Sequence, residues 1–344
     1  MKNKLFLALA LTGVVGTLVA CGGNETPSTP AAPSENTSVG ETTGNGLSIG
    51  VGMISAEPAL SYGAPQLELN FATAVYNGDD VVSTLVDVYQ VPLSKESCAI
   101  DTSKDFATET NVLTKRDRHD GYAMKPASPI GKEWWEQAAV LESYVEGNID
   151  EETYTAGCTM LTDTLVAAVN EAKVNAKGAV TVNSGNYTIA LGHHIAFDGE
   201  EVLTQVNITV IGLLLDSNSK IVTSYLDEIQ IPLTFTAGEA NPYTITPTNA
   251  YGSPTTQYNY KGQTIASKKE LGDDYDMKKA SPIGKEWWEQ AAALEDYLVG
   301  KTVTELDAYS EDLTAGCTMY TGSYFAAITN AVDSSLYNTK AFTL

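Results

Sequence analysis

The chain has 344 residues, 43% of them hydrophobic, and a formal net charge of −23. This length is enough for two ordinary domains. The acidity argues against nucleic acid and anionic lipid surfaces as partners, because both are recognised by basic protein surface.

The first twenty residues have the form of a secretory signal peptide. Lys2 and Lys4 precede an apolar stretch, residues 5–20, that is short for a membrane span and ends in a small residue. Cys21 follows directly, and residues 18–21, Leu-Val-Ala-Cys, resemble the lipobox of bacterial lipoproteins. The resemblance implies that Cys21 receives a diacylglyceride and becomes the first residue of a mature protein anchored on the outer face of the cytoplasmic membrane. A plain secretory signal with a chance cysteine is the alternative.

Residues 21–46 form a predicted linker between the anchor and the rest of the chain. After Cys21 the side chains are small or polar, with Val39 as the one sizeable apolar residue. Such a segment cannot bury enough apolar surface to fold. It would span roughly 25–30 Å, enough to hold a domain just off a bilayer.

Three sequence blocks occur twice in the same order, which indicates an internal duplication. The block Ala-Ser-Pro-Ile-Gly-Lys-Glu-Trp-Trp-Glu-Gln-Ala-Ala recurs without change. A period this long is typical of tandem domains rather than a solenoid. We expect two independently folding copies, residues 47–177 and 178–344. The paired blocks are 87–93 with 227–233, 127–139 with 280–292, and 155–160 with 314–319.

Each copy begins with β-strand patterns. Apolar runs separated by polar turns predict a hairpin at 66–91 in the first copy and at 206–229 in the second. Pro92 and Pro232 lack the N–H that a central strand needs, so each strand should end there. With the helices that follow, the sequence predicts an α+β fold in which each copy is an antiparallel sheet with two C-terminal helices.

The repeated block predicts the first helix of each copy. In the first copy Ser128 can cap it and Pro129 fits its first position, and Gly147 is expected to end it. The adjacent tryptophans Trp135 and Trp288 point off the apolar face, where they either pack or offer a stacking platform for sugars or flavin. The apolar stripes are Ile130, Trp134, Ala138, Leu141 and Val145, and then Ile283, Trp287, Ala291, Leu294 and Leu298.

A second helix is predicted after Thr159 and after Thr318. This places Gly-Cys-Thr at a helix N-terminus, where free N–H groups and the helix dipole favour an anion. Gly157 or Gly316 would let the backbone approach that anion closely, and a threonine hydroxyl there is suited to carry a phosphoester. The expected apolar faces are Leu161, Leu165, Ala168 and Ala172, and then Tyr320, Tyr324, Ala327 and Ala331.

Residues 312–331, which begin Asp-Leu-Thr-Ala-Gly-Cys-Thr, resemble the end of the FMN-binding domain family. That family includes flavin-bearing subunits of ion-pumping NADH:quinone oxidoreductases and of Rnf complexes, and surface lipoproteins of extracellular electron transfer. Its signature is Asp, two variable residues, Ser or Thr, Gly, Ala and Thr. A dedicated FMN transferase uses FAD to attach FMN through its phosphate to the final threonine.

In the second copy the resemblance implies Thr318 as the attachment residue, Gly316 as the close-approach glycine and Asp312 as the leading acid. Cys317 stands where the family has alanine, and Ala315 where it has serine or threonine.

In the first copy Thr159 and Gly157 match the signature, and Thr153 replaces the acid. Cys158 and Ala156 depart from the family's residues in the same way as their counterparts in the second copy.

The resemblance implies an electron carrier rather than a stand-alone enzyme. Covalent FMN would receive electrons from a membrane dehydrogenase or quinol and pass them to an extracellular acceptor. The alternative is a non-redox binding or scaffold lipoprotein with a flavin-free fold of the same kind, which uses its tryptophans and tyrosine-rich loop to bind wall polysaccharide.

Other chemistry has little support in the sequence. His193 and His194 are neighbours in a predicted strand and face opposite sides, so they cannot chelate one metal ion together. Cys98, Cys158 and Cys317 remain once Cys21 is lipidated, and an odd number favours buried thiols over a closed disulfide framework. The acidic cluster at 273–276 lacks an EF-hand pattern, which favours a solvated loop.

The lipobox gives the first testable prediction. Cys21→Ser should leave the precursor uncleaved by the lipoprotein peptidase and unlabelled by a palmitate analogue, because serine lacks the thiol that accepts the lipid. Metabolic labelling and the mobility of the precursor on a gel measure both effects. Normal acyl labelling of the variant would contradict lipidation at this residue.

Overall fold

The strands of the two copies form two antiparallel sheets in the computed structural model, which confirms the predicted α+β fold. The predicted signal peptide, Cys21 and nearly all of the predicted linker lie outside the described residues. The described residues are 45–344 without 56–57, 62, 200–201 and 254–264.

The first sheet is built on the predicted hairpin, β3 (Ala64–Asn77) with β4 (Asp80–Pro92), which ends at Pro92 as expected. β1 (Asn45–Ser55) pairs with β3, and so does the short β2 (Ala59–Ser61). β5 (Val180–Val182) returns after the helices to pair with β1. The sheet of the first copy therefore extends a few residues beyond the expected boundary at 177/178.

The second sheet repeats this arrangement except for the short strand, which pairs with β8 rather than with the counterpart of β3. β6 (Asn186–Asp198) pairs with β7 (Gln205–Leu215), and the predicted hairpin joins β7 to β8 (Ile221–Phe235). β10 (Thr339–Thr343) returns to pair with β6 as β5 does with β1.

One strand end was predicted wrongly. β8 continues three residues beyond Pro232, which takes part in the last pair of the ladder with β7. The residues after it pair instead with β9 (Tyr243–Ile245), so the proline lies where β8 changes partners.

The helical half of each copy contains two long helices and several short ones. None of the helices among the described residues is both long and apolar enough to cross a membrane. In the first copy they are α1 (Lys115–Arg118), η1 (His119–Tyr122), α2 (Trp134–Val145), α3 (Glu151–Gly157) and α4 (Asp163–Asn175). In the second copy they are α5 (Lys268–Leu271), η2 (Gly272–Tyr275), η3 (Met277–Lys279), α6 (Trp287–Leu298), η4 (Val303–Glu305), α7 (Glu311–Thr314) and α8 (Gly322–Ala331).

The first long helix begins later than the sequence predicted. α2 starts at Trp134 rather than after Ser128, because Gly131 adopts a φ of +62° that a right-handed helix cannot contain. Glu133 is the N-cap, and its side chain accepts from the backbone in a capping box. Ile130 therefore lies in the preceding turn. Ile283, its counterpart in the second copy, also lies before the helix and is exposed. The remaining stripe residues lie in α2 and α6, and all of them except Val145 are buried.

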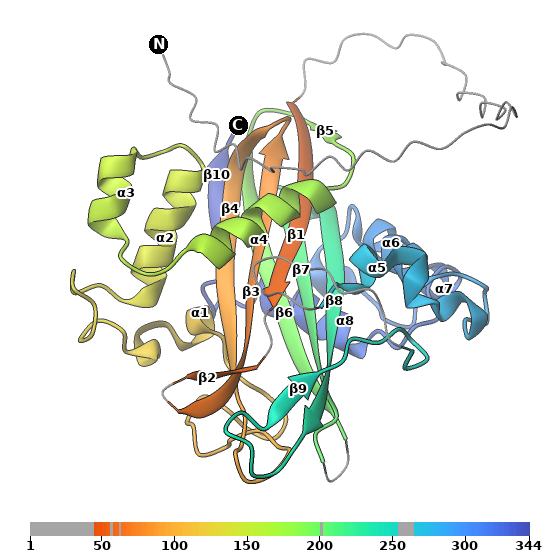
Figure 1. Cartoon of the computed structure of the whole chain (residues 1–344). Helices are drawn as coiled ribbons and strands as arrows, with labels where there is room; N and C mark the ends of the chain where they lie inside the picture. The colour runs from red at the N-terminus through yellow and green to blue at the C-terminus, as the bar shows by residue number, and fades with distance from the viewer. Residues whose placement is uncertain (1–44, 56–57, 62, 200–201, 254–264) are drawn as a thin grey trace, which may run out of the picture. The chain divides into compact units, whose positions relative to one another are not determined.

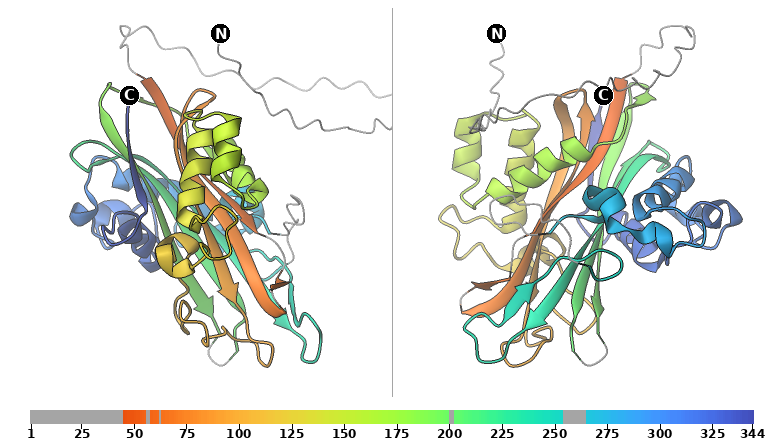
Figure 2. Two further views of the ribbon diagram at one scale, coloured as in Figure 1. Left: turned by 90° about the vertical axis from the view of Figure 1, so that its left-hand side faces the viewer. Right: turned by 45° about the vertical axis from the view of Figure 1, so that its right-hand side comes forward.

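The sheets pack face to face, and the helices cover their outer faces, so the layers run helices, sheet, sheet, helices (Figures 1 and 2). The described residues form one compact unit. The central core takes residues from both copies, so the two copies share one core. Its fully buried members include Leu47, Ile49, Leu67, Leu69 and Phe71 of the first copy and Ile189, Leu191, Val206, Ile208 and Val210 of the second.

Glycines let the last long helix of each copy lie directly on its first strand. A Cβ at Gly52 would come within 2.0 Å of the carbonyl oxygen of Ala168 in α4. A Cβ at Gly192 would come equally close to the carbonyl oxygen of Ala327 in α8. Any side chain at these two positions would push the helix away from the sheet.

Contacts between the sheets follow a twofold pattern. β1 contacts β7 and β8 of the second copy, and β6 makes the equivalent contacts with β3 and β4 of the first. Each copy thus presents the same surface to the other, as in an isologous dimer.

The shared core predicts the behaviour of separated halves. Residues 45–183 and 184–344, expressed singly, should each expose the inner face of a sheet and self-associate or fail to melt cooperatively, because so large an apolar patch is not stable in water. Co-expression should restore one heterodimer with a sharp thermal transition. Sedimentation and calorimetry measure this. A monomeric half with a cooperative melt would contradict it.

Candidate cofactor-attachment sites and the pocket of the second copy

Thr318 lies on the loop between α7 and α8, with its side chain exposed. Its backbone N–H donates to Oε1 of Gln290 at 2.8 Å, and its hydroxyl donates to the same oxygen at 3.1 Å. Thr159 is also exposed and makes the same pair of bonds to Gln137, at 2.8 and 3.3 Å. One glutamine of the repeated block therefore holds each threonine loop.

The glutamine is itself fixed at its other end. Nε2 of Gln290 donates to Oγ of Ser281 at 3.0 Å and to the carbonyl oxygen of Lys285 at 3.2 Å. These bonds turn Oε1 toward the loop. Sequence reasoning missed this residue, although its recurrence in the unchanged block was a signal that could have found it.

The threonines are not at a helix N-terminus, so this prediction was wrong. The N-caps of α4 and α8 are Thr162 and Thr321, three residues further along. The first residues of the expected apolar faces precede these helices and are not buried: Leu161 is 95% exposed and Tyr320 is 86% exposed. The dipole argument for an anion at these loops therefore fails, whereas the exposed hydroxyls remain.

The two signature glycines lie against the first long helix of their copy. A Cβ at Gly316 would come within 2.8 Å of Cβ of Ala293, and one at Gly157 within 3.0 Å of Cγ1 of Val140. The structure thus gives these glycines a packing role, in which they let the loop lie close to α6 or α2.

Cys158 and Cys317 are buried free thiols beside the threonines, which confirms the prediction for them and for Cys98. Burial raises the pKa of both loop thiols, and a backbone N–H directed at each sulfur lowers it by less. The positive charge of Lys132 also lowers the pKa of Cys158. The thiols therefore stay protonated near neutral pH and serve packing.

The acid position differs between the copies. Asp312 is exposed in the first turn of α7. Thr153, its counterpart, lies in α3 and donates its backbone N–H to the N-cap Asp150 at 2.9 Å. The structure brings Asp312, Gly316, Cys317 and Thr318 together on one short segment.

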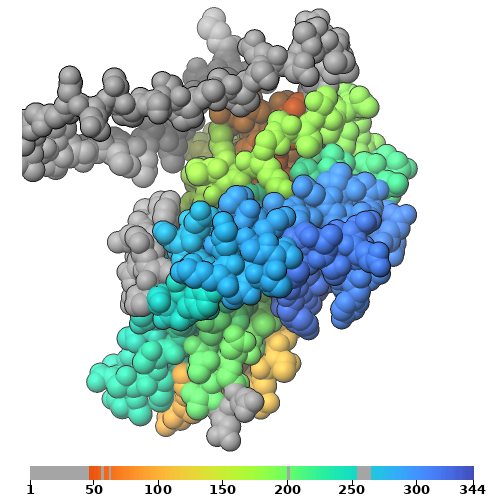
Figure 3. All heavy atoms as spheres, turned by 90° about the vertical axis from the view of Figure 1, so that its right-hand side faces the viewer, coloured from red at the N-terminus to blue at the C-terminus, as the bar shows by residue number. Residues whose placement is uncertain are grey.

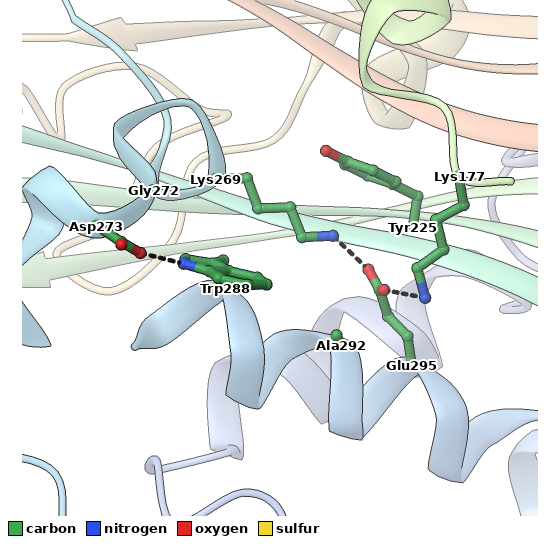
Figure 4. A pocket seen from close by; sticks show the side chains of 8 residues that line it. All are labelled: Lys177, Tyr225, Lys269, Gly272, Asp273, Trp288, Ala292 and Glu295. Carbon is green, nitrogen blue, oxygen red and sulfur yellow. Dashed lines mark hydrogen bonds and ion pairs between the residues drawn. The ribbon is translucent and has the colours of Figure 1, made fainter. Parts of the chain in front are cut away.

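A pocket of about 450 Å³ lies on another side of α6 (Figure 4). Trp288 and Glu295 face it from α6, whereas Gln290 projects from the opposite side of the helix toward Thr318. The pocket and the attachment loop are therefore separate sites. Its lining is Lys177, Tyr225, Lys269, Gly272, Asp273, Trp288, Ala292 and Glu295.

The pocket forms where the two copies meet. Figure 3 shows the end of the first copy, in yellow-green, directly beside the blue helices of the second. From that segment Lys177 forms an ion pair with Glu295, which also binds Nζ of Lys269 at 2.6 Å. The ring of Tyr225 faces Lys269, with the ammonium 3.6 Å from the ring centroid. These segments are far apart in the sequence, which gave no signal of the pocket.

The two exposed-face tryptophans have different surroundings. Trp135 stacks on His119 with centroids 4.3 Å apart, and Tyr337 stacks on the other face of His119 at 3.8 Å. Trp288 lines the pocket and is 40% exposed. The predicted stacking platform of the first copy, Trp135, is thus covered by the rings of His119 and Tyr337.

His193 is buried at the seam between the copies rather than in a metal site. Its Nδ1 lies 2.7 Å from the hydroxyl of Tyr89, and its Nε2 lies 3.5 Å from Oδ1 of Asp117. Burial lowers the pKa of His193, but the Asp117 carboxylate and Asp87 outweigh this and raise it overall. No three His, Cys, Asp or Glu side chains within the described ranges are arranged to hold a metal ion.

At the place related to His193 and its neighbour Asn330 by the twofold pattern, the structure has Met53 and a buried glutamate, Glu171. The backbone N–H of His193 donates to Asn330 of α8 at 3.0 Å, and that of Met53 donates to Glu171 of α4 at 3.2 Å. Burial and the nearby Glu270 raise the pKa of Glu171 from 4.5 to about 9. Glu171 is therefore protonated in the folded protein at neutral pH.

Comparison with known proteins finds a partial similarity. The chain is 32% identical over 127 residues to the chlorophenol reductase of Desulfitobacterium hafniense, a match that covers 37% of this chain and 37% of that protein. No protein-family model matches the chain. No solved structure matches it either.

The buried glutamate gives a pH-dependent prediction. Between about pH 4.5 and pH 9 Glu171 is protonated in the folded state and ionised in the unfolded state, so its contribution to the stability should fall as the pH rises through this range. Glu171→Gln keeps an acceptor for the Met53 N–H and removes the titration. The variant should therefore gain melting temperature relative to the wild type from pH 5 to pH 9.

Thermal melts at several pH values measure this difference. The exposed Glu152→Gln in α3 serves as a control and should track the wild type throughout. A constant difference between Glu171→Gln and the wild type at all pH values would contradict a protonated Glu171.

Proposed function

We propose that this chain is a lipid-anchored electron-transfer protein of the cell surface that carries FMN in phosphoester linkage on Thr318, and secondarily on Thr159. The observation that carries the proposal is an exposed threonine hydroxyl on a loop held by a buried glutamine, present in both copies at the position of the family's attachment residue.

The hydrogen bonds of the loop suit an ester on this hydroxyl. Oε1 of Gln290 accepts from both the N–H and the O–H of Thr318. When Oγ bonds to phosphorus it loses its proton, and the shorter N–H bond still holds the loop. The attachment would thus change the side chain and leave the backbone in place.

Exposure on both loops also suits attachment by another protein. The hydroxyls of Thr318 and Thr159 can be reached from solvent, so a transferase could act on the folded domain. Each loop exposes one large apolar side chain two residues further on, Tyr320 or Leu161, which can contact a flat ring system.

The proposed chemistry divides between the cofactor and the chain. FMN supplies one- and two-electron redox chemistry when bound. The transferase would join Thr318 Oγ to the FMN phosphate of FAD, with AMP as the leaving group. Lipid on Cys21 would keep the protein close to its electron donor, a membrane dehydrogenase or quinol. The relative from Desulfitobacterium is named a reductase, which agrees with a redox role.

Loading of the two threonines can be tested separately. Only the second copy has the leading acid, Asp312, so FMN should load first or only on Thr318. Co-expression with the transferase should add one FMN, roughly 440 Da, to the mature protein, and Thr318→Val should lose this mass because valine has no hydroxyl to esterify. Intact-mass spectrometry gives the measurement.

Thr159→Val is the matched control and should keep the adduct. Thr318→Val removes the hydrogen bond from the threonine hydroxyl to Gln290. Such a bond is worth about 1 kcal/mol, and a protein of this size should tolerate its loss. A circular-dichroism melt checks this. No mass gain in the wild type, under conditions that load a known substrate of the transferase, would contradict the proposal and favour the flavin-free scaffold.

A further inference from the structure

The second tryptophan of the repeated block makes the same hydrogen bond in both copies. The indole N–H of Trp135 donates to Asp120 at 2.9 Å, and that of Trp288 donates to Asp273 at 3.0 Å. Each ring is thus fixed at its nitrogen edge by the 3₁₀ turn that follows a short helix.

The copies differ in what covers the ring. In the first copy the imidazole of His119 lies nearly parallel to Trp135, with an interplanar angle of 15°. In the second copy Gly272 takes the position of His119, with a φ of +54° against +47°. No atom lies within 4 Å of the place where a Cβ on Gly272 would stand. The stacking partner of Trp288 is therefore missing, and its place is open.

Both copies also have a glutamate bound by two basic side chains near the tryptophan ring. In the first copy Glu142 binds Arg116 and lies 3.8 Å from Lys340. In the second copy Glu295 binds Lys177 and Lys269. An ammonium group has three donors, so each lysine keeps donors for a further acceptor after it binds Glu295.

The pocket is therefore polarised along its length (Figure 4). Asp273 lies at the end where the indole nitrogen is held. The two ammonium groups lie at the other end with Tyr225 and with Glu295, so this end holds two positive charges and one negative charge. The volume of about 450 Å³ falls in the usual range for small-molecule sites.

We propose that this pocket binds a small planar aromatic anion, with its ring stacked on Trp288 in the place of the missing imidazole and its anionic group paired with Lys177 and Lys269. The site is independent of flavin attachment, because Thr318 lies on the other side of α6. A carboxylate or phenolate on one edge of the ring matches the cationic end of the pocket, and Asp273 disfavours an anion at the opposite end.

The test uses 2-naphthoate as a probe, titrated calorimetrically into the mature protein with the detergent blank subtracted. Two further probes separate the contributions: 2-naphthylmethanol has the ring without the charge, and cyclohexanecarboxylate has the charge without the flat ring. We expect 2-naphthoate to bind at least tenfold more tightly than either.

Gly272→His should weaken 2-naphthoate binding at least tenfold, because it places the first copy's own stacking ring in the pocket. His119 shows that histidine adopts this backbone conformation in the same turn. The matched control is Gly131→His, a glycine with a φ of +62° and open space around its Cβ, which lies away from the pocket. It should bind the probe as the wild type does.

Thermal melts of both variants show whether each is folded under the titration conditions. The proposal is overturned if the wild type does not bind 2-naphthoate at millimolar concentration, if cyclohexanecarboxylate binds equally well, or if folded Gly272→His binds like the wild type. Should Gly272→His fail to fold, Trp288→Leu replaces it, and undiminished binding in that variant overturns the proposal.

Discussion

The structure depends on the burial of two apolar sheet faces against each other. Strands of both sheets are covered on the inner side by the other copy and on the outer side by helices, so they are buried on both faces. The segment 206–215 shows the result, since nearly every residue in it is apolar and fully buried. The helices must then lie on the outside, and their connecting loops come to the flanks of the molecule.

Local patterns in the sequence predicted the elements but not their partners. Both hairpins and the apolar stripes from Trp134 and Trp287 were predictable, because turn residues and helical spacing act over a few residues. The face-to-face sheets were not, since an apolar run is equally compatible with a helix or with a second sheet as its cover. Within the candidate site the sequence located Thr318, yet Gln290, which holds it, lies 28 residues earlier and is joined to it only by the fold.

The arrangement of layers separates the two attachment loops. Thr159 follows α3 in one outer layer and Thr318 follows α7 in the other, with both sheets between them (Figure 1). If both threonines carry FMN, each cofactor would meet redox partners from its own flank. The chain would then act as two separate carriers rather than as a relay from one flavin to the other.

The twofold seam has a consequence for how the protein can vary. In a homodimer every substitution at such a seam appears twice, so a histidine that suits one side must also be tolerated at its mirror position. In this chain the two copies have separate sequences, so a residue in one copy can change without a change in the other. Where the copies meet, His193 therefore binds Asn330 on one side and Met53 binds Glu171 at the equivalent place on the other. In the same way His119 covers Trp135 in the first copy, while Gly272 leaves the pocket beside Trp288 open in the second. Two copies in one chain can therefore differ from each other at the residues where they meet, which identical subunits cannot do.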